Sequence, residues 1–183
     1  MRVSVIGTSG SGKTTFAAEL ARRLGCRHID LDAINWQAGW RDLNTHDPEE
    51  FRRRTAAAVA DEAWTCCGNY SAVRDLVLGR ATHLVWLDYP LGLVMARVLK
   101  RSLHRGWTKD ELWPGTGNRE TLRNQFLSRD SLFWWALKTS RRRRRELPLV
   151  LARPEHAHLI VHRFRRAEEA TEWLERQPAT AGL

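Results

Sequence analysis

Residues 7–14 read Gly7-Thr8-Ser9-Gly10-Ser11-Gly12-Lys13-Thr14 and fit the pattern G-x-x-x-x-G-K-[ST] at every fixed position. The preceding residues 3–6 form a short, mostly apolar run that is typical of a buried strand, and residues 15–24 are apolar at helical spacing. A strand, a glycine-rich turn and a helix are together the context that a phosphate-binding loop requires. The glycines let backbone N–H groups converge on phosphate oxygens, and the helix N-terminus adds its positive dipole end.

This loop predicts a binding site for a nucleoside triphosphate. Lys13 is expected to reach the β- and γ-phosphates, and the hydroxyl of Thr14 to take one position on Mg²⁺. The alternative is an ordinary turn rich in glycine and serine that happens to precede a helix, but eight matching positions with the right flanks favour the phosphate-binding loop. The predicted nucleotide-binding residues are Gly7, Thr8, Ser9, Gly10, Ser11, Gly12, Lys13, Thr14 and Thr15.

The composition is that of a soluble globular protein. The 183 residues suit a single domain, and 43% of them are hydrophobic and 28% charged. No apolar run approaches the length of a membrane span, and the N-terminus leads directly into a strand, so we expect a cytoplasmic protein. The formal net charge of +9 favours a polyanionic partner, which is a nucleotide, a nucleic acid or an acidic membrane face. Cys26, Cys66 and Cys67 have no metal-binding or disulfide spacing and are expected to be reduced thiols.

Strand-like and helix-like segments alternate along the chain, which predicts a parallel sheet covered by helices. Residues 26–32 are predicted to form a second strand that ends in Asp30 and Asp32, at the sheet edge where ligands collect. The alternative is that one of these carboxylates only caps the following turn. A later strand, residues 82–88, ends in Asp88, and the helix after it carries Arg97 and Arg101 on one face, which favours phosphate contact over a solvated face.

Several other segments complete the predicted order of elements. A strand at residues 64–67 leads into Gly68-Asn69-Tyr70, a helix is expected over 48–63, and residues 106–118 look like a mobile loop. A long helix is expected from residue 119 past the five arginines at 141–145, which are either a solvated face or, as the minority interpretation, a contact with nucleic acid or membrane. The last strand is expected at 158–162 and the last helix at 167–174, followed by a flexible tail at 177–183.

These pieces together resemble the adenylate-kinase-like branch of P-loop proteins. More closely, they resemble the small bacterial family of DNA topology modulation proteins, whose members are predicted small-molecule kinases. The resemblance covers residues 1–175, and its marks are Leu31-Asp32 with Trp36, Gly39 and Trp40; Gly68-Asn69-Tyr70; and Leu87-Asp88-Tyr89-Pro90 before an arginine-rich helix.

The resemblance implies an α/β fold of three layers, in which a five-stranded parallel sheet of order 2-3-1-4-5 has helices on both faces and a helical lid. Residues 1–176 would form one P-loop kinase-like domain, with the lid at about 105–120 and the arm that holds the phosphoryl acceptor at about 33–63. Arg97 and Arg101 would grip the transferring phosphoryl group, and Asp32 would orient the acceptor hydroxyl as the candidate base. The implied acceptor residues are Asp32, Trp36, Trp40, Gly68, Asn69 and Tyr70.

One position departs from the family's pattern. Cys67 stands where the relatives tend to carry an aspartate that holds Mg²⁺ through water. A neutral thiol does not replace a carboxylate for a hard cation, which prefers oxygen. Asp30, Asp32 or Asp88 would then supply the missing charge, and Thr14 and Asp88 are the predicted metal-site residues.

The favoured function is an ATP- and Mg²⁺-dependent phosphotransferase that acts on a small acceptor. The alternatives are a nucleic-acid-associated NTPase, suggested by the positive charge, and a nucleotide-binding regulator with little turnover, suggested by Cys67. Trp36, Trp40 and Tyr70 either stack on a flat acceptor or belong to the packed core, since the chain holds nine tryptophans.

Overall fold

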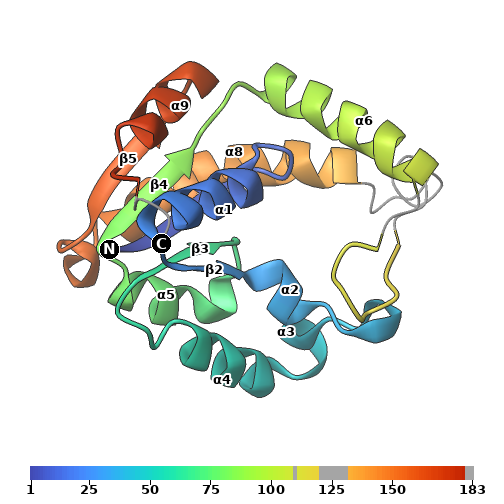
Figure 1. Cartoon of the computed structure of the whole chain (residues 1–183), viewed down its shortest axis with the longest axis horizontal. Helices are drawn as coiled ribbons and strands as arrows, with labels where there is room; N and C mark the ends of the chain where they lie inside the picture. Colours follow the sequence, from blue (N-terminus) through green and yellow to red (C-terminus); the bar gives the residue numbers. More distant parts are fainter. Residues whose placement is uncertain (109–110, 120–131, 180–183) are drawn as a thin grey trace.

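Strand β1 (Arg2–Gly7) occupies the centre of a five-stranded sheet in the computed structural model, which describes residues 1–108, 111–119 and 132–179 (Figure 1). The strand order is β2-β3-β1-β4-β5 and all neighbours are parallel, which confirms the expected topology. The other strands are β2 (Arg27–Asp30), β3 (Trp64–Cys67), β4 (His83–Leu87) and β5 (Ile160–Phe164).

Helices cover both faces of this sheet, as expected for three layers. One face carries α1 (Lys13–Leu24), α6 (Leu91–Thr108) and α9 (Ala167–Glu175), and the other carries α4 (Pro48–Ala58), α5 (Arg74–Arg80) and α8 (Leu132–Leu151). Short connecting elements are α2 (Leu31–Asn35), η1 (Ala38–Trp40), α3 (Leu43–His46), η2 (Ser71–Val73) and η3 (Pro154–His156). Of the described helices, none combines the length and the apolar character needed to cross a bilayer.

The buried hydrophobic residues form two clusters, one on each face of the sheet, and successive residues of β1 contribute to both. Val3 and Val5 of β1 pack with Phe16 and Leu20 of α1, whereas Ile6 packs with the cluster beneath α4, α5 and α8. Because successive side chains of a strand point to opposite faces, one short apolar strand supplies both cores. The C-terminal edge of the sheet is thereby fixed between two packed layers of helices.

Some boundaries differ from those expected. β2 ends at Asp30, because the Asp30 carboxylate accepts a 3.0 Å hydrogen bond from the N–H of Asp32 and caps α2. Asp32 therefore lies in the first turn of a helix and not on the strand. α4 ends at Ala58 rather than 63, and β5 begins two residues later than expected, at Ile160. Pro148 lies inside α8, which continues to Leu151.

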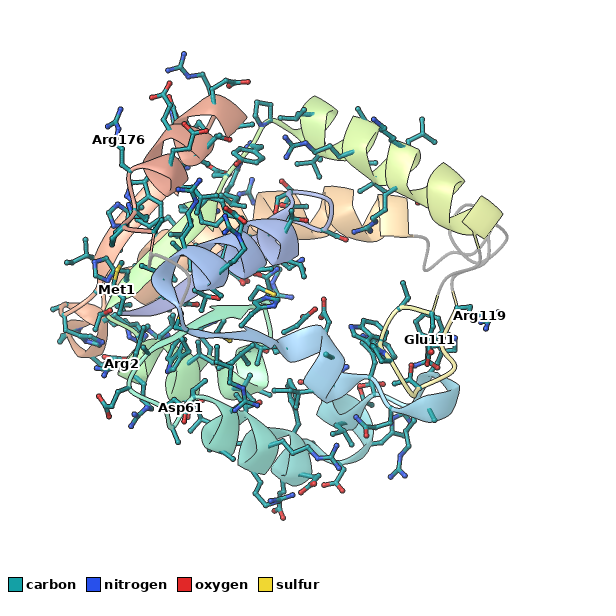
Figure 2. The ribbon with its side chains drawn as sticks, viewed as in Figure 1. Met1, Arg2, Asp61, Glu111, Arg119 and Arg176 are labelled. Atoms are coloured by element: carbon teal, nitrogen blue, oxygen red, sulfur yellow. The ribbon has the colours of Figure 1, made fainter. Side chains whose placement is uncertain are left out.

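The segment expected to form the lid begins as helix, since α6 continues to Thr108. Residues 111–119 then form a turn that is closed by a bridge between Glu111 and Arg119, and Figure 2 shows both residues beside the α2–α3 segment. Asn118 is buried in this contact: it accepts from the N–H of Trp40 at 3.0 Å and donates to the carbonyl of Gln37 at 2.9 Å. Residues 109–110, 120–131 and 180–183, where parts of the lid, the long helix and the tail were expected, lie outside the described residues.

Candidate active site

The phosphate-binding loop turns sharply between β1 and α1. The N–H of Ser11 donates to the carbonyl of Thr8 at 2.9 Å, and Gly12 caps α1 with a φ of 86°, a left-handed conformation that a side chain would strain. The Ser11 hydroxyl is buried, and within the described residues it has no hydrogen-bond partner. Lys13 is partly buried, and its ammonium likewise makes no hydrogen bond or ion pair with a described residue. Uncommitted donors at a helix N-terminus fit a bound triphosphate.

Helix α6 brings Arg97 to this loop, and its predicted contact with phosphate stays a prediction. Its Nη1 donates to the carbonyl of Ser11 at 3.0 Å, and its guanidinium lies 5.3 Å from the centre of the Tyr89 ring. Arg101 follows one turn later on the same helix. A guanidinium fixed beside the loop suits the equatorial oxygens of a transferring phosphoryl group.

Gly68 and Asn69 were expected to contact the acceptor, and the structure also gives each of them a positioning role. The amide of Asn69 donates to the carbonyl of Gly7 at 2.6 Å and accepts from its N–H at 3.4 Å, so it holds the start of the loop. Gly68 has a φ of 143°, and a Cβ there would lie 2.6 Å from the Cβ of Leu31. The absence of a side chain thus lets the end of β3 approach α2 closely.

Three acidic or hydroxyl-bearing side chains meet at the ends of β2 and β3. The hydroxyl of Tyr70 donates a 2.7 Å hydrogen bond to Oδ1 of Asp32, while Asp30 lies opposite Cys67 in the β2–β3 register. Burial, reinforced by the Asp32 charge, raises the pKa of the Asp30 carboxyl above its usual value. Burial also raises the pKa of the Tyr70 hydroxyl, which therefore stays protonated and donates.

Cys67 joins this cluster to the phosphate-binding loop. Its thiol donates weakly to the Thr14 hydroxyl, 3.7 Å away, and lies 3.5 Å from Nε2 of His28. Burial raises the pKa of the Cys67 thiol to about 12, so that it is neutral at physiological pH. Burial lowers the pKa of His28, which favours its neutral form, and the carboxyl that faces Cys67 across the β2–β3 register is that of Asp30.

Asp88, which was predicted at the metal site, is engaged by two arginines. Its Oδ1 accepts from Nε of Arg144 at 2.6 Å, and its Oδ2 accepts from Nη2 of Arg163 at 2.6 Å. The Arg163 guanidinium also lies over the Trp86 ring, 4.1 Å from its centre. Both carboxylate oxygens are thus engaged by arginines, and Asp88 ties β4 to α8 and β5. Its assignment to the Mg²⁺ site stays a prediction.

The five-arginine run is likewise not a uniformly solvated face. Arg142 is exposed and pairs with Glu146 at 2.7 Å, but Arg143 is partly buried and donates to the Thr8 hydroxyl at 3.2 Å. Burial, with the nearby charge of Arg74, lowers the pKa of the Arg143 guanidinium to about 10. Sequence reasoning missed Arg143, although its spacing of four residues from the buried Leu147 is a signal that both share an inward face.

A cavity of about 270 Å³ opens beside Tyr70, between the sheet and helices α5 and α8. Its apolar wall is formed by Ile6, Leu31, Val77, Leu78, Leu84 and Leu147. Its polar side carries Tyr70, Arg74, Arg142, Arg143 and Glu146. Such an apolar body with a few polar groups is the usual character of a small-molecule site.

Trp36 and Trp40, expected near the acceptor, do not line this cavity. The Trp36 ring stacks on Trp113 with centroids 6.3 Å apart, and Trp40 packs edge-on against both, at 5.7 and 6.2 Å. The arrangement agrees with the packing interpretation of these tryptophans: together with Asn118 they join the 111–119 turn to the arm.

Comparison with known proteins gives the chain its family. A family profile described as an AAA domain matches residues 3–125. The chain belongs to the AAA domain family. A shikimate kinase of Symbiobacterium thermophilum is 32% identical over 117 residues, which cover 57% of this chain and 67% of the relative. A putative adenylate kinase of Pyrococcus furiosus is 26% identical over 114 residues, 61% of this chain and 59% of the relative.

Solved structures similar to this AAA domain protein share its fold. A sugar kinase from a Janibacter species has a TM-score of 0.50 at 24% identity and covers 97% of both chains. A shikimate kinase from Acinetobacter baumannii has a TM-score of 0.54 at 18% identity, over 94% of this chain and 90% of that one. The protein is therefore P-loop kinase-like, while its membership of the DNA topology modulation family stays a prediction.

Proposed function

We propose that this protein is a phosphotransferase that moves the γ-phosphoryl group of ATP to a hydroxyl of a small acceptor. The contact between Cys67 and Thr14 carries the proposal, because it puts the Asp30–Asp32–Tyr70 cluster beside the phosphate-binding loop. A donor site and a carboxylate held by a hydrogen bond thus share one end of the sheet. The kinase names of the relatives and structural neighbours support the same reaction class.

The chain's own groups account for the proton transfer and for part of the charge stabilisation in such a reaction. The acceptor oxygen forms a bond to the γ-phosphorus, the bond from that phosphorus to the β–γ bridging oxygen breaks, and ADP leaves with its electron pair. Asp32 receives the acceptor proton, while Tyr70 holds its Oδ1 in place. Lys13 and Arg97 stabilise the charge on the phosphoryl oxygens, so catalysis is mainly positioning and electrostatic stabilisation.

The residues present also fit Mg²⁺, which supplies charge neutralisation on the β- and γ-phosphates when bound. The Thr14 hydroxyl would ligate the ion, and Asp30 would supply the carboxylate that the neutral thiol of Cys67 does not. We leave Asp88 out of this metal site because its carboxylate pairs with Arg144 and Arg163. We leave Asp32 out because Tyr70 orients it toward the acceptor in our proposal. Oxygen donors alone suit this hard cation.

The nucleic-acid-associated alternative loses part of its basis in this geometry. Arg143 and Arg144 of the five-arginine run turn toward Thr8 and Asp88 and not outward to a polyanion. The low-turnover alternative was suggested by the absence of a carboxylate at Cys67. Asp30 lies opposite Cys67, and in our proposal its carboxylate takes over that role.

A transfer assay tests the proposal. Purified protein is incubated with Mg²⁺ and ATP labelled at the γ-phosphate, together with a panel of hydroxyl-bearing acids, sugars, nucleosides and nucleotides. We expect label to appear on at least one acceptor, and an Asp32→Asn variant to lose that transfer while still binding ATP. Label that is released only as inorganic phosphate across the whole panel would contradict the proposal.

A further inference from the structure

Arg74 and Arg143 come from different helices and share the polar side of the 270 Å³ cavity. Both side chains are partly buried. Within the described residues, neither guanidinium forms an ion pair, and the one hydrogen bond of Arg143 is to the uncharged Thr8 hydroxyl. The positive charge of Arg74 adds to burial in lowering the pKa of Arg143. Two like charges therefore lie close together in a half-enclosed space.

Other arginines around this site are neutralised. Arg144 and Arg163 pair with Asp88, and Arg52 pairs with Asp75, which follows Arg74 in the first turn of α5. The cavity's own carboxylate, Glu146, is engaged by the exposed Arg142. Arg74 and Arg143 form no such pair with a described residue, and the Asp88 charge only partly offsets the lowering of the Arg143 pKa. Partly buried charge without an ion-pair partner is unfavourable unless a ligand supplies one.

The surroundings of the pair limit what the ligand can be. Behind the arginines the cavity is walled by aliphatic side chains, and at its edge Tyr70 is hydrogen-bonded to Asp32. Arg143 also contacts Thr8 of the phosphate-binding loop, so the cavity adjoins both the proposed base and the donor site. Its volume suits a small metabolite and is too small for a macromolecular chain.

We propose that this cavity holds the acceptor, and that the acceptor carries an anionic group, a carboxylate or a phosphate, which binds between Arg74 and Arg143. The apolar wall receives the carbon skeleton, and the hydroxyl to be phosphorylated lies toward Asp32. That the bound molecule is the phosphoryl acceptor rests on the proposed function. That the cavity binds an anion is argued independently, from the Arg74–Arg143 pair. Guanidinium forks bind both kinds of oxyanion with charge-assisted hydrogen bonds.

The test separates this anion site from the phosphate-binding loop, which also binds anions. Inorganic phosphate and malonate are titrated, at constant ionic strength, into protein already saturated with Mg²⁺ and ADP, and binding is followed by thermal unfolding. We expect saturable stabilisation of the wild type by at least one of the two probes. Arg74→Gln should weaken that binding about 10- to 100-fold, as expected for charge-assisted hydrogen bonds. Arg176→Gln, the matched control at an exposed arginine that pairs with Glu172 on α9 and does not line the cavity, should leave it unchanged.

The unfolding temperature without anion and the relative affinity of the two probes provide two further tests. Without any anion, Arg74→Gln should unfold at a higher temperature than the wild type, because the repulsion with Arg143 is relieved; Arg74→Lys retains the charge and should not show this gain. The more tightly bound probe indicates whether the acceptor's anion is a phosphate or a carboxylate. Equal effects of Arg74→Gln and Arg176→Gln, or no saturable binding with ADP bound, would overturn the anion site. Anion binding without transfer in the panel assay would overturn only the proposed function.

Discussion

The phenolic hydroxyl of Tyr70 donates a 2.7 Å hydrogen bond to Oδ1 of Asp32, across the gap between the end of β3 and the first turn of α2. The two residues are 38 positions apart in the chain, and only the parallel pairing of β2 and β3 brings them together. Because burial raises the pKa of Tyr70, its hydroxyl remains a donor over the whole physiological range. The bond orients one carboxylate oxygen, and Oδ2 makes no hydrogen bond to any described residue.

Replacing Asp32 by asparagine should remove the proton acceptor while it keeps the shape of the side chain. We expect kcat to fall by about 100- to 10,000-fold, the usual contribution of a general base, with little change in KM for ATP. Tyr70→Phe, which removes only the orienting bond, should lower kcat by a smaller factor. Steady-state kinetics with the acceptor found in the panel assay measures both, and a full kcat in Asp32→Asn would exclude Asp32 as the base.

Asp30→Asn should leave the protein at least as stable as the wild type, although it lowers the activity. Folding raises the pKa of Asp30, so its ionised form destabilises the native state above the unfolded-state pKa of about 4, and this cost disappears as the pH falls below that value. Asparagine keeps an oxygen to accept from the N–H of Asp32 but carries no charge. We expect the variant to unfold at a temperature equal to or above that of the wild type at pH 8, and to lose the difference near pH 3.

Asp30→Asn should also need more Mg²⁺ and transfer more slowly, because the carboxylate opposite Cys67, whose thiol contacts Thr14, is gone. The complementary change, Cys67→Asp, adds a third carboxylate near Asp30 and Asp32. Neighbouring negative charges oppose the ionisation of such a carboxylate. We expect Cys67→Asp not to raise the rate. A strong rise would show that the thiol limits catalysis and that Asp30 does not compensate for it.

Asp88→Asn should affect stability and leave the metal requirement unchanged. The Asp88 side chain is 6% exposed and contacts two arginines that are 41% and 36% exposed. Since both arginines keep partial access to water, we expect a loss of about 1–3 kcal/mol in the free energy of unfolding, less than for a fully buried pair. Urea unfolding measures the loss, and Glu172→Gln, at an exposed pair with Arg176, is the control with little effect. A selective fall in Mg²⁺ affinity would restore Asp88 to the metal site.

Asn118→Ala should loosen the contact between the 111–119 turn and the arm, because it removes the bonds to Trp40 and Gln37. If this turn acts as the lid, water then competes with the acceptor more successfully, and the ratio of phosphate release to transfer rises several-fold. Thr116→Val removes two bonds inside the turn, to the carbonyl of Trp113 and from the N–H of Asn118, but keeps the Asn118 side chain, and should leave the ratio near that of the wild type. Equal ratios in Asn118→Ala and the wild type would argue against a closing role.

The features predicted correctly from the sequence are those with a local physical cause. Eight adjacent residues suffice for the phosphate-binding loop, and the alternation of apolar strands with helices, read with the family resemblance, suffices for the sheet order. The capping of α2 by Asp30 was only one of two alternatives, since the spacing of Asp30 and Asp32 suits a strand and a helix start equally.

The features that were missed depend on residues far apart in the chain. Arg144 and Arg163 lie 56 and 75 positions from Asp88, and no local pattern marks them as its partners. Trp113 reaches Trp36 only because the turn folds back on the arm. The sequence therefore predicted that charged side chains gather at the sheet edge. It did not predict which of them pair, because tertiary packing decides that.

The central claim, phosphoryl transfer from the Gly7–Thr14 loop, is tested most directly by comparing the wild type with Lys13→Ala in the labelled-ATP transfer assay. Lys13 is the charge that faces the β- and γ-phosphates in this account, and it makes no ion pair with a described residue whose loss would disturb the fold. We predict that Lys13→Ala folds with an unchanged unfolding temperature, binds ATP more weakly and shows no measurable transfer. Transfer by Lys13→Ala at the wild-type rate would contradict the assignment of this loop as the donor site.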